Sequence, residues 1–201
     1  MKVKLFGASG KVGLVLAPAL EAAGHELVEL DAAEAMIDFT APDAVVGNIA
    51  SALETGVPCI VGTSGWETAP VEAKAREAGV AVLYAPNFAI GAVLMIRFAA
   101  EAAKHIPRAE IVELHHETKV DAPSGTAKAT AEAMGGDVPI HSVRLPGIVA
   151  HQEVLLSQPG ELLTIRHDAL SREAYVPGVL LALERLQDLA PGLTIGLESL
   201  L

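Results

Sequence analysis

Sulfur and aromatic side chains are scarce in this 201-residue sequence, which has one cysteine and only 3% Phe, Trp and Tyr. A single cysteine excludes an internal disulfide, and the apolar setting of Cys59 in VPCIVG is typical of a buried strand rather than of a nucleophile's site. This cysteine usage fits a reducing compartment, and we therefore expect a cytoplasmic protein.

Long apolar runs and an excess of positive charge are also missing. The best candidate span, AIGAVLMIRFAA, is interrupted by Arg97 and falls short of the roughly 18 residues that a membrane helix needs. MKVKLF reaches Gly7 before the apolar core of a signal peptide could form. With 14 Lys+Arg against 25 Asp+Glu, the formal charge is −11, and no basic cluster offers a footprint for nucleic acid. We expect neither a membrane nor a nucleic-acid partner.

Apolar residues make up 51% of the chain, enough for a sizeable core, and the first half alternates two kinds of segment. Strands are predicted at KVKLFG, HELVEL (ending at Asp31), AMIDFT, VPCIVGT and VAVLYAP, with helix-like segments between them. This alternation predicts an α/β unit, in which helices flank a parallel sheet.

From about Ala89 the pattern changes to an α+β order. A helix-like segment leads to the strand AEIVELHH, a polar loop and the helix GTAKATAEAM. Residues 140–158, 161–170 and 172–177 then predict antiparallel strands, turned by Pro-Gly pairs. The final stretch predicts a helix over 178–190 and a last strand in LTIGLESLL.

A glycine-rich turn, FGASGKVG, lies between the first strand and the first helix. Gly7, Gly10 and Gly13 would let the chain turn tightly and bring backbone N–H groups against a pyrophosphate. Asp31 follows Gly13 by 31 − 13 = 18 residues, near the roughly 20-residue spacing at which a carboxylate meets a ribose hydroxyl. The alternatives are a tight strand–helix turn without a ligand and an ordinary residue at a strand end.

A dense polar cluster, ELHHETKVDAPSGTAKA, follows the strand of the second half. Ser124 is a plausible N-cap, so the N–H groups of Gly125 and Thr126 would point at an anion, with Lys119 nearby as a full charge. A histidine can exchange a proton near neutral pH, and the cluster therefore suits reduction of an unsaturated dicarboxylate. The alternatives are purely structural: a helix cap, a histidine bonded to the backbone, and a solvated lysine.

Metal binding and nucleophilic hydrolysis are not expected. Neighbouring residues such as His115 and His116 point to opposite faces of a strand, and no second Cys/His group has ligand spacing nearby. GTSG at 62–65 is not a GxSxG elbow and has no histidine beside it.

Taken in order, GASGKVG, IDFT, GTSG, APNF and HHETKVDAPSGTA resemble the 4-hydroxy-tetrahydrodipicolinate reductases, formerly dihydrodipicolinate reductases. The last motif is highly specific, and SVR at 142–144, GE at 160–161 and SR at 171–172 extend the resemblance over nearly the whole chain. The resemblance implies an NAD(P)H-dependent oxidoreductase of diaminopimelate and lysine biosynthesis that gives tetrahydrodipicolinate.

The resemblance also assigns roles to residues. It implies that the dinucleotide is bound by the turn Gly7, Ala8, Ser9, Gly10, Lys11, Val12 and Gly13, and that Asp31 holds the adenosine ribose. It places Gly62, Thr63, Ser64, Ala85, Pro86, Asn87 and Phe88 at the nicotinamide end. His115 is implied as a proton donor and acceptor and Lys119 as a second proton donor, with His116, Ser124, Gly125 and Thr126 as ligands of the substrate.

The sequence thus predicts a Rossmann-like dinucleotide-binding domain, formed by residues 1–88 and 179–201, and a substrate-binding domain with a mixed sheet at 89–178. The family's usual homotetramer implies assembly through the second domain. One departure is the segment before IDFT, where DAAEAM is shorter than the family's usual loop. Two alternatives are a nonenzymatic dinucleotide sensor and a dehydrogenase of another small substrate, which would not need HHETKVDAPSGT.

Overall fold

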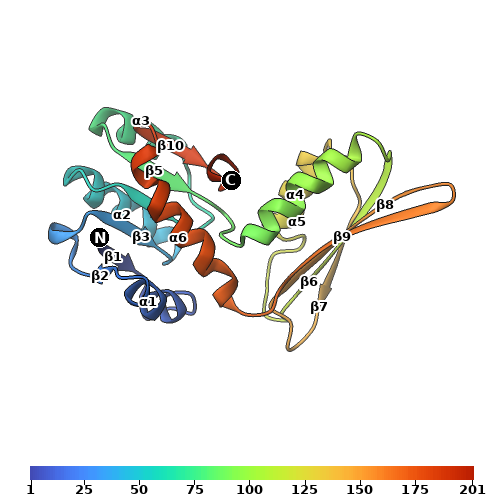
Figure 1. Cartoon of the computed structure of the whole chain (residues 1–201), viewed down its shortest axis with the longest axis horizontal. Helices are drawn as coiled ribbons and strands as arrows, with labels where there is room; N and C mark the ends of the chain where they lie inside the picture. Colours follow the sequence, from blue (N-terminus) through green and yellow to red (C-terminus); the bar gives the residue numbers. More distant parts are fainter. The chain divides into compact units, whose positions relative to one another are not determined.

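The computed structural model describes residues 1–201, which divide into two compact units (Figure 1). Unit 1 comprises residues 1–88 and 175–201, and unit 2 comprises residues 89–174. The chain therefore returns to unit 1 after residue 174, whereas the sequence analysis placed the return after residue 178.

Unit 1 contains a six-stranded sheet in the order β10-β5-β4-β3-β1-β2, and all neighbouring strands are parallel. Its strands are β1 (Lys2–Phe6), β2 (Glu26–Leu27), β3 (Ala35–Asp38), β4 (Cys59–Val61), β5 (Ala81–Tyr84) and β10 (Gly192–Ile195). Its helices are α1 (Gly13–Ala22), α2 (Pro42–Glu54), α3 (Ala69–Ala78) and α6 (Val176–Arg185), with short 3₁₀ turns η1 (Leu30–Ala32), η3 (Leu186–Asp188) and η4 (Glu198–Leu200). The predicted Rossmann-like α/β fold is confirmed.

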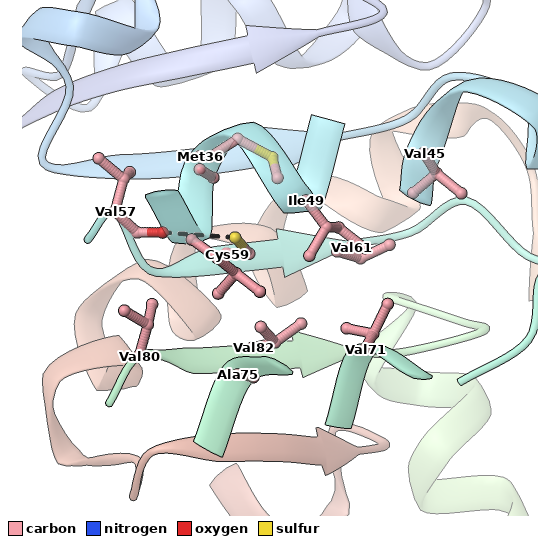
Figure 2. Close-up of a cluster of buried hydrophobic side chains, with 12 residues drawn as sticks. Met36, Val45, Ile49, Val57, Cys59, Val61, Val71, Ala75, Val80 and Val82 are labelled. Atoms are coloured by element: carbon pink, nitrogen blue, oxygen red, sulfur yellow. Dashed lines mark hydrogen bonds between the residues drawn. The ribbon is translucent and has the colours of Figure 1, made fainter. Parts of the chain in front are cut away.

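The central strands of unit 1 are buried on both faces. Every residue of β3 and β4 is buried, as expected where helices cover both sides of a parallel sheet. Figure 2 shows part of this core, where Met36 and Cys59 meet the apolar faces of α2 and α3. Burial raises the pKa of Cys59 to about 12, with the nearby Asp38 charge adding to the effect, so this thiol is unreactive.

The second strand is shorter than predicted. β2 ends at Leu27, and Asp31 lies in η1 rather than at a strand end. The pairing of this edge strand with β1 stops after two residues, Lys2 and Val3. The expected position of Asp31 at the carboxyl end of a sheet strand was therefore wrong.

Unit 2 contains a four-stranded mixed sheet in the order β7-β6-β8-β9, which confirms the predicted α+β class. Its strands are β6 (Arg108–His115), β7 (Ile140–Arg144), β8 (Ala150–Gln158) and β9 (Glu161–Ala169), and its helices are α4 (Ile90–Ala103) and α5 (Gly125–Ala133). None of the helices in either unit combines the length and the apolar composition needed to cross a bilayer.

Two predictions for this region were wrong. β7 and β8, predicted as antiparallel strands turned by Pro146-Gly147, do not pair with each other, because β6 lies between them. β7 pairs in parallel with β6 after the crossover through α5, and this pair makes the sheet mixed, as predicted. Residues 172–177 do not form a strand but a 3₁₀ turn, η2 (Arg172–Tyr175), and the start of α6. Pro177 lies in the first turn of α6, where its missing N–H has no intrahelical partner to lose.

One face of the unit 2 sheet packs against α4 and α5. Ile111 from β6 and Val154 from β8 meet Met95 and Ala127 in this core. Since side chains alternate along a strand, Glu113 and His115 share the face of Ile111 and lie on the helix-covered side. A carboxylate is thereby buried beside a histidine.

Candidate functional site

The glycine turn of unit 1 follows the carboxyl end of β1. Gly7 has a φ of +83°, and a Cβ there would lie 2.2 Å from the carbonyl oxygen of Phe39. A Cβ on Gly13 would lie 2.0 Å from the carbonyl oxygen of Gly7. Only glycine fits either position, and the turn has the close backbone packing that a dinucleotide-binding motif requires.

The start of α1 suits an anion. Its N-cap residue, Val12, offers no side-chain acceptor, and its first turn carries no acidic residue. Ala8, Ser9 and Lys11 are exposed around it. The positive end of the helix dipole is thus left without a negative protein group, which is the arrangement that accommodates a pyrophosphate.

A buried carboxylate, Asp38, organises the segments that follow β3 and β4. It is fully buried and accepts hydrogen bonds from the hydroxyl of Thr63 at 2.6 Å and from the Asn48 side-chain amide at 2.7 Å. It also accepts from the backbone N–H of Thr40 at 3.0 Å and from the Thr40 hydroxyl at 2.7 Å. Asp38 was not among the predicted site residues, although an acid within an apolar strand is a signal of such a network.

The ring of Phe39, which follows β3, contacts two of the predicted cofactor segments. A Cβ on Gly62 would lie 2.1 Å from the Cε1 atom of Phe39. The same ring contacts Phe88, with ring centroids 5.4 Å apart. The segments after β3, β4 and β5 therefore meet at the carboxyl edge of the sheet, where open α/β sheets bind ligands.

The remaining predicted cofactor residues differ in exposure. Ser64 and Pro86 are exposed, Asn87 is half-buried, and Ala85 is buried. Asp31 is exposed in η1. Glu29, close to it in the chain, is engaged by Lys4, whose Nζ lies 2.6 Å from the Glu29 carboxylate.

In unit 2 the polar cluster is built on a fully buried carboxylate, Glu113. Arg144 of β7 donates to both of its oxygens, at 3.0 and 2.8 Å, and the Nδ1 atom of His115 contacts Oε2. Burial by itself would raise the pKa of Glu113, but hydrogen bonds from Arg144, Ser142 and His115 hold it at about 2. Glu113 is therefore ionised at neutral pH.

His115 lies half-buried at the end of β6. Burial lowers its pKa, the Glu113 carboxylate raises it, and Lys119 and Arg144 lower it further. With Nδ1 bonded to Glu113, Nε2 is the ring nitrogen left to exchange a proton with a ligand.

The loop after β6 carries Lys119 and His116. The Nζ of Lys119 lies 2.7 Å from the carboxylate of Asp121, and Arg144 donates to the Asp121 carbonyl oxygen at 2.8 Å. His116 is exposed, and its Nδ1 lies 3.0 Å from the hydroxyl of Thr118. Lys119 is thus held in place by Asp121, while His116 forms its hydrogen bond within the loop.

Ser124 forms the N-cap of α5, as predicted. Its hydroxyl accepts from the N–H of Ala127 at 3.2 Å, and its own N–H donates to Glu113 Oε1 at 3.3 Å. Gly125 is exposed, and a Cβ there would have no heavy atom within 4 Å. The start of α5 is therefore open to an incoming group and tied to Glu113.

Sequence reasoning missed Glu113 and Arg144 as members of this cluster. Glu113 precedes His115 by two residues on a strand, a spacing that places both side chains on one face. Arg144 comes from another strand and is brought to Glu113 by the pairing of β7 with β6. The spacing could have indicated Glu113, but Arg144 depends on strand order.

Comparisons with known proteins agree over both units. The family model described as "Dihydrodipicolinate reductase, N-terminus" matches residues 28–88, and the one described as "Dihydrodipicolinate reductase, C-terminus" matches residues 91–201. A 4-hydroxy-tetrahydrodipicolinate reductase from Mycobacterium marinum is 46% identical over 243 residues, covering 100% of this chain and 99% of the relative. One from Mycolicibacterium smegmatis matches with the same identity and coverage.

A solved structure extends this likeness to the fold. The dipicolinate-bound dihydrodipicolinate reductase from Paenisporosarcina sp. TG-14 has a TM-score of 0.84 and 28% identity, covering 100% of this chain and 99% of that one. Aspartate semialdehyde dehydrogenase II from Vibrio cholerae shares the fold alone, with a TM-score of 0.60 at 13% identity. The M. marinum match spans 243 − 201 = 42 positions more than this chain has, so that relative carries segments absent here.

Proposed function

We propose that this chain, which belongs to the dihydrodipicolinate reductase family, binds a reduced nicotinamide dinucleotide in unit 1 and a cyclic dicarboxylate in unit 2. Its reaction is the reduction of 4-hydroxy-tetrahydrodipicolinate to tetrahydrodipicolinate with NADH or NADPH, in diaminopimelate and lysine biosynthesis. A hydride and a proton are added, and the 4-hydroxyl leaves as water. The observation that carries the proposal is the cluster of His115, Lys119 and the open start of α5 on one side of unit 2.

The dinucleotide fits the carboxyl edge of the unit 1 sheet. The glycine turn after β1 and the uncapped start of α1 supply backbone N–H groups for the pyrophosphate. We assign Gly62, Thr63, Ser64 and residues 85–88 to the nicotinamide end, with Asp38 and Phe39 holding these segments together. When bound, the reduced nicotinamide supplies the hydride.

The substrate's carboxylates fit the start of α5. The start of this helix carries the positive end of its dipole, which favours an anion. Gly125 leaves the approach open, and Thr126 and His116 add polar groups. The Paenisporosarcina reductase, which has the same fold, was solved with the dicarboxylate dipicolinate bound.

The proton chemistry is assigned to His115 and Lys119. Glu113 holds His115 through Nδ1, so Nε2 is the nitrogen that exchanges a proton with the substrate. Lys119, in the loop after β6, carries a second proton beside Asp121. Lys119, and His115 once it has taken up a proton, also stabilise the negative charge that develops on the substrate as hydride arrives.

We further assign the enzyme to the cytoplasm and to a homotetramer built on unit 2. β9 is an edge strand with most of its residues exposed, including Leu162 at 64%. Unpaired edges and exposed apolar residues are features that oligomers cover. Light scattering tests the assembly: a tetramer is expected, and a monomeric active enzyme would contradict it.

A coupled assay tests the activity. Substrate generated in place by the preceding synthase is offered with NADH or NADPH in separate reactions, and cofactor oxidation is followed. We expect oxidation that depends on both ligands. Folded protein that binds NADH but never oxidises it would instead favour a dinucleotide sensor.

A further inference from the structure

We propose that Glu113 is a positioning residue, which holds His115 with its proton on Nδ1 and connects it to the substrate-binding start of α5. The inference rests on the proposed role of His115 as proton donor. Glu113 itself touches no ligand, because its side chain is fully buried.

The Glu113 carboxylate is held in its ionised form. Both Glu113 oxygens accept from the Arg144 guanidinium, a two-point contact that favours the ionised form. An ionised carboxylate has no proton to donate and can only accept. The contact with His115 therefore requires that Nδ1 be the donor, and the neutral ring must carry its hydrogen there.

The hydrogen on Nδ1 determines which nitrogen of the His115 ring reacts. A neutral histidine with hydrogen on Nδ1 presents a bare Nε2, which takes up a proton and returns it. The carboxylate behind the ring stabilises the imidazolium formed in between. Glu113 thus fixes both the orientation of His115 and the nitrogen that reacts.

Glu113 and Arg144 also connect the segments around His115. Glu113 Oε1 accepts from the N–H of Ser124, the N-cap of α5, and its partner Arg144 donates to the carbonyl oxygen of Asp121. Asp121 in turn pairs with Lys119. The ion pair between Glu113 and Arg144 therefore sets the positions of the histidine, the lysine loop and the helix start together.

The charged groups around His115 move its pKa in opposite directions. Glu113 on β6 raises the pKa of the ring, whereas Lys119 in the loop and Arg144 on β7 lower it, and the Asp121 carboxylate also interacts with it. Removing Glu113 and removing Arg144 should therefore move the pKa of His115 in opposite directions. A residue needed only for folding would not produce this pair of shifts.

The experiment is nitrogen NMR of labelled, ligand-free enzyme across a pH titration, with Glu113→Gln and Arg144→Met. In the unaltered enzyme we expect neutral His115 with hydrogen on Nδ1. In E113Q the single amide oxygen stays with Arg144 and Ser124, so the amide N–H₂ faces Nδ1, the hydrogen moves to Nε2 and the pKa of His115 falls. In R144M that pKa rises.

Glu110→Gln is the matched control. Glu110 lies on the same strand and its carboxylate is 2.8 Å from Nε2 of His141, but both side chains are more than half exposed. E110Q should leave the His115 signals unchanged. E113Q should also lower kcat about 10²-fold, within the range that general acids contribute, and shift the pH profile of kcat to lower pH.

The proposal is overturned if His115 of the unaltered enzyme carries its hydrogen on Nε2, a result that needs no variant to fold. It is also overturned if E113Q keeps the Nδ1 hydrogen and an unchanged pKa. A tautomer change in E113Q together with full turnover in His115→Gln would leave the positioning intact and refute the proposed role of His115.

Discussion

Phe39 lies across Gly62 so closely that a single added carbon at residue 62 would meet the ring at 2.1 Å. The same ring contacts Phe88, so the segments that follow three adjacent strands share one packing contact. The position of the proposed nicotinamide site therefore depends on a glycine that has no chemical role of its own.

Replacing Gly62 with alanine should displace the Phe39 ring and weaken cofactor binding. We expect a stability loss of about 1–3 kcal/mol from overpacking, together with a raised Kd for NADH. Thermal unfolding and fluorescence titration measure the two effects. Gly47→Ala is the control, because a Cβ there meets nothing within 4 Å and the site lies inside α2; equal losses in both variants would refute the packing argument.

His115→Gln and Lys119→Met should each reduce turnover while leaving the cofactor in place. General acid groups contribute roughly 10²–10⁴-fold, and a large part of that should be lost in each variant. NADH affinity should stay near that of the unaltered enzyme, because both residues belong to unit 2 and the glycine turn to unit 1. Steady-state kinetics and NADH titration test this, and turnover close to normal in either variant would remove that residue from the mechanism.

Gly125→Val and Thr126→Val should weaken binding of a dicarboxylate. A Cβ at residue 125 meets no protein heavy atom within 4 Å, so a loss of affinity in the valine variant is expected to come from obstruction of the ligand. Loss of the Thr126 hydroxyl should cost about 1.5–3 kcal/mol if it bonds a charged oxygen. Calorimetric titration with pyridine-2,6-dicarboxylate in the presence of NADH measures both.

Ala133→Val serves as the control for these variants, since it places a valine at the exposed opposite end of α5. Its affinity for the dicarboxylate should not change. Unchanged affinity in the Gly125 and Thr126 variants as well would place the carboxylates elsewhere.

Cofactor choice should lean modestly toward NADH. The exposed Asp31 carboxylate would repel a 2′-phosphate, while Lys11 in the glycine turn partly offsets the repulsion. Asp31→Asn should shift the ratio of kcat/KM values toward NADPH, and Glu29→Gln should not, because Lys4 already neutralises Glu29. A strong NADPH preference in the unaltered enzyme would refute the assignment of Asp31.

Glu113 should make stability depend on acidity. Its pKa of about 2 in the folded protein lies below the ordinary value of 4.5, so its ionised form stabilises the fold above that value. This contribution, on the order of 3 kcal/mol, is lost as the pH falls from about 5 to 2. Denaturant unfolding of the unaltered protein and E113Q at several pH values should show a shrinking difference over this window; a constant difference would contradict it.

Local sequence signals predicted much of unit 1 correctly. A glycine turn between a strand and a helix, and apolar strands repeated with helices between them, are sufficient to indicate a Rossmann-like sheet. The second strand was overextended because HELVEL is apolar enough for a longer strand, whereas the actual pairing stops at Leu27. Strand length at a sheet edge depends on the neighbour and not on propensity.

The candidate sites were predicted less completely. His115, Lys119 and Ser124 lie within one short segment, and that proximity is visible in the sequence. Asp38 bonds to Thr63 across 25 residues, and Glu113 bonds to Arg144 across 31. Such pairs form only when strands take their places in a sheet, and no local pattern encodes them.

The order of the strands in unit 1 has a consequence for synthesis of the chain. β10 pairs with β5 through residues 192–195, and these residues leave the ribosome after every residue of unit 2. Until then β5 is the open edge of the sheet, and two of its residues, Val82 and Leu83, are fully buried in the finished fold. An unpaired apolar edge is a template for association with other chains. The nascent protein is therefore exposed to aggregation until residues 192–195 have been made, and a nonsense codon between the codons for residues 174 and 192 should yield insoluble rather than merely inactive product.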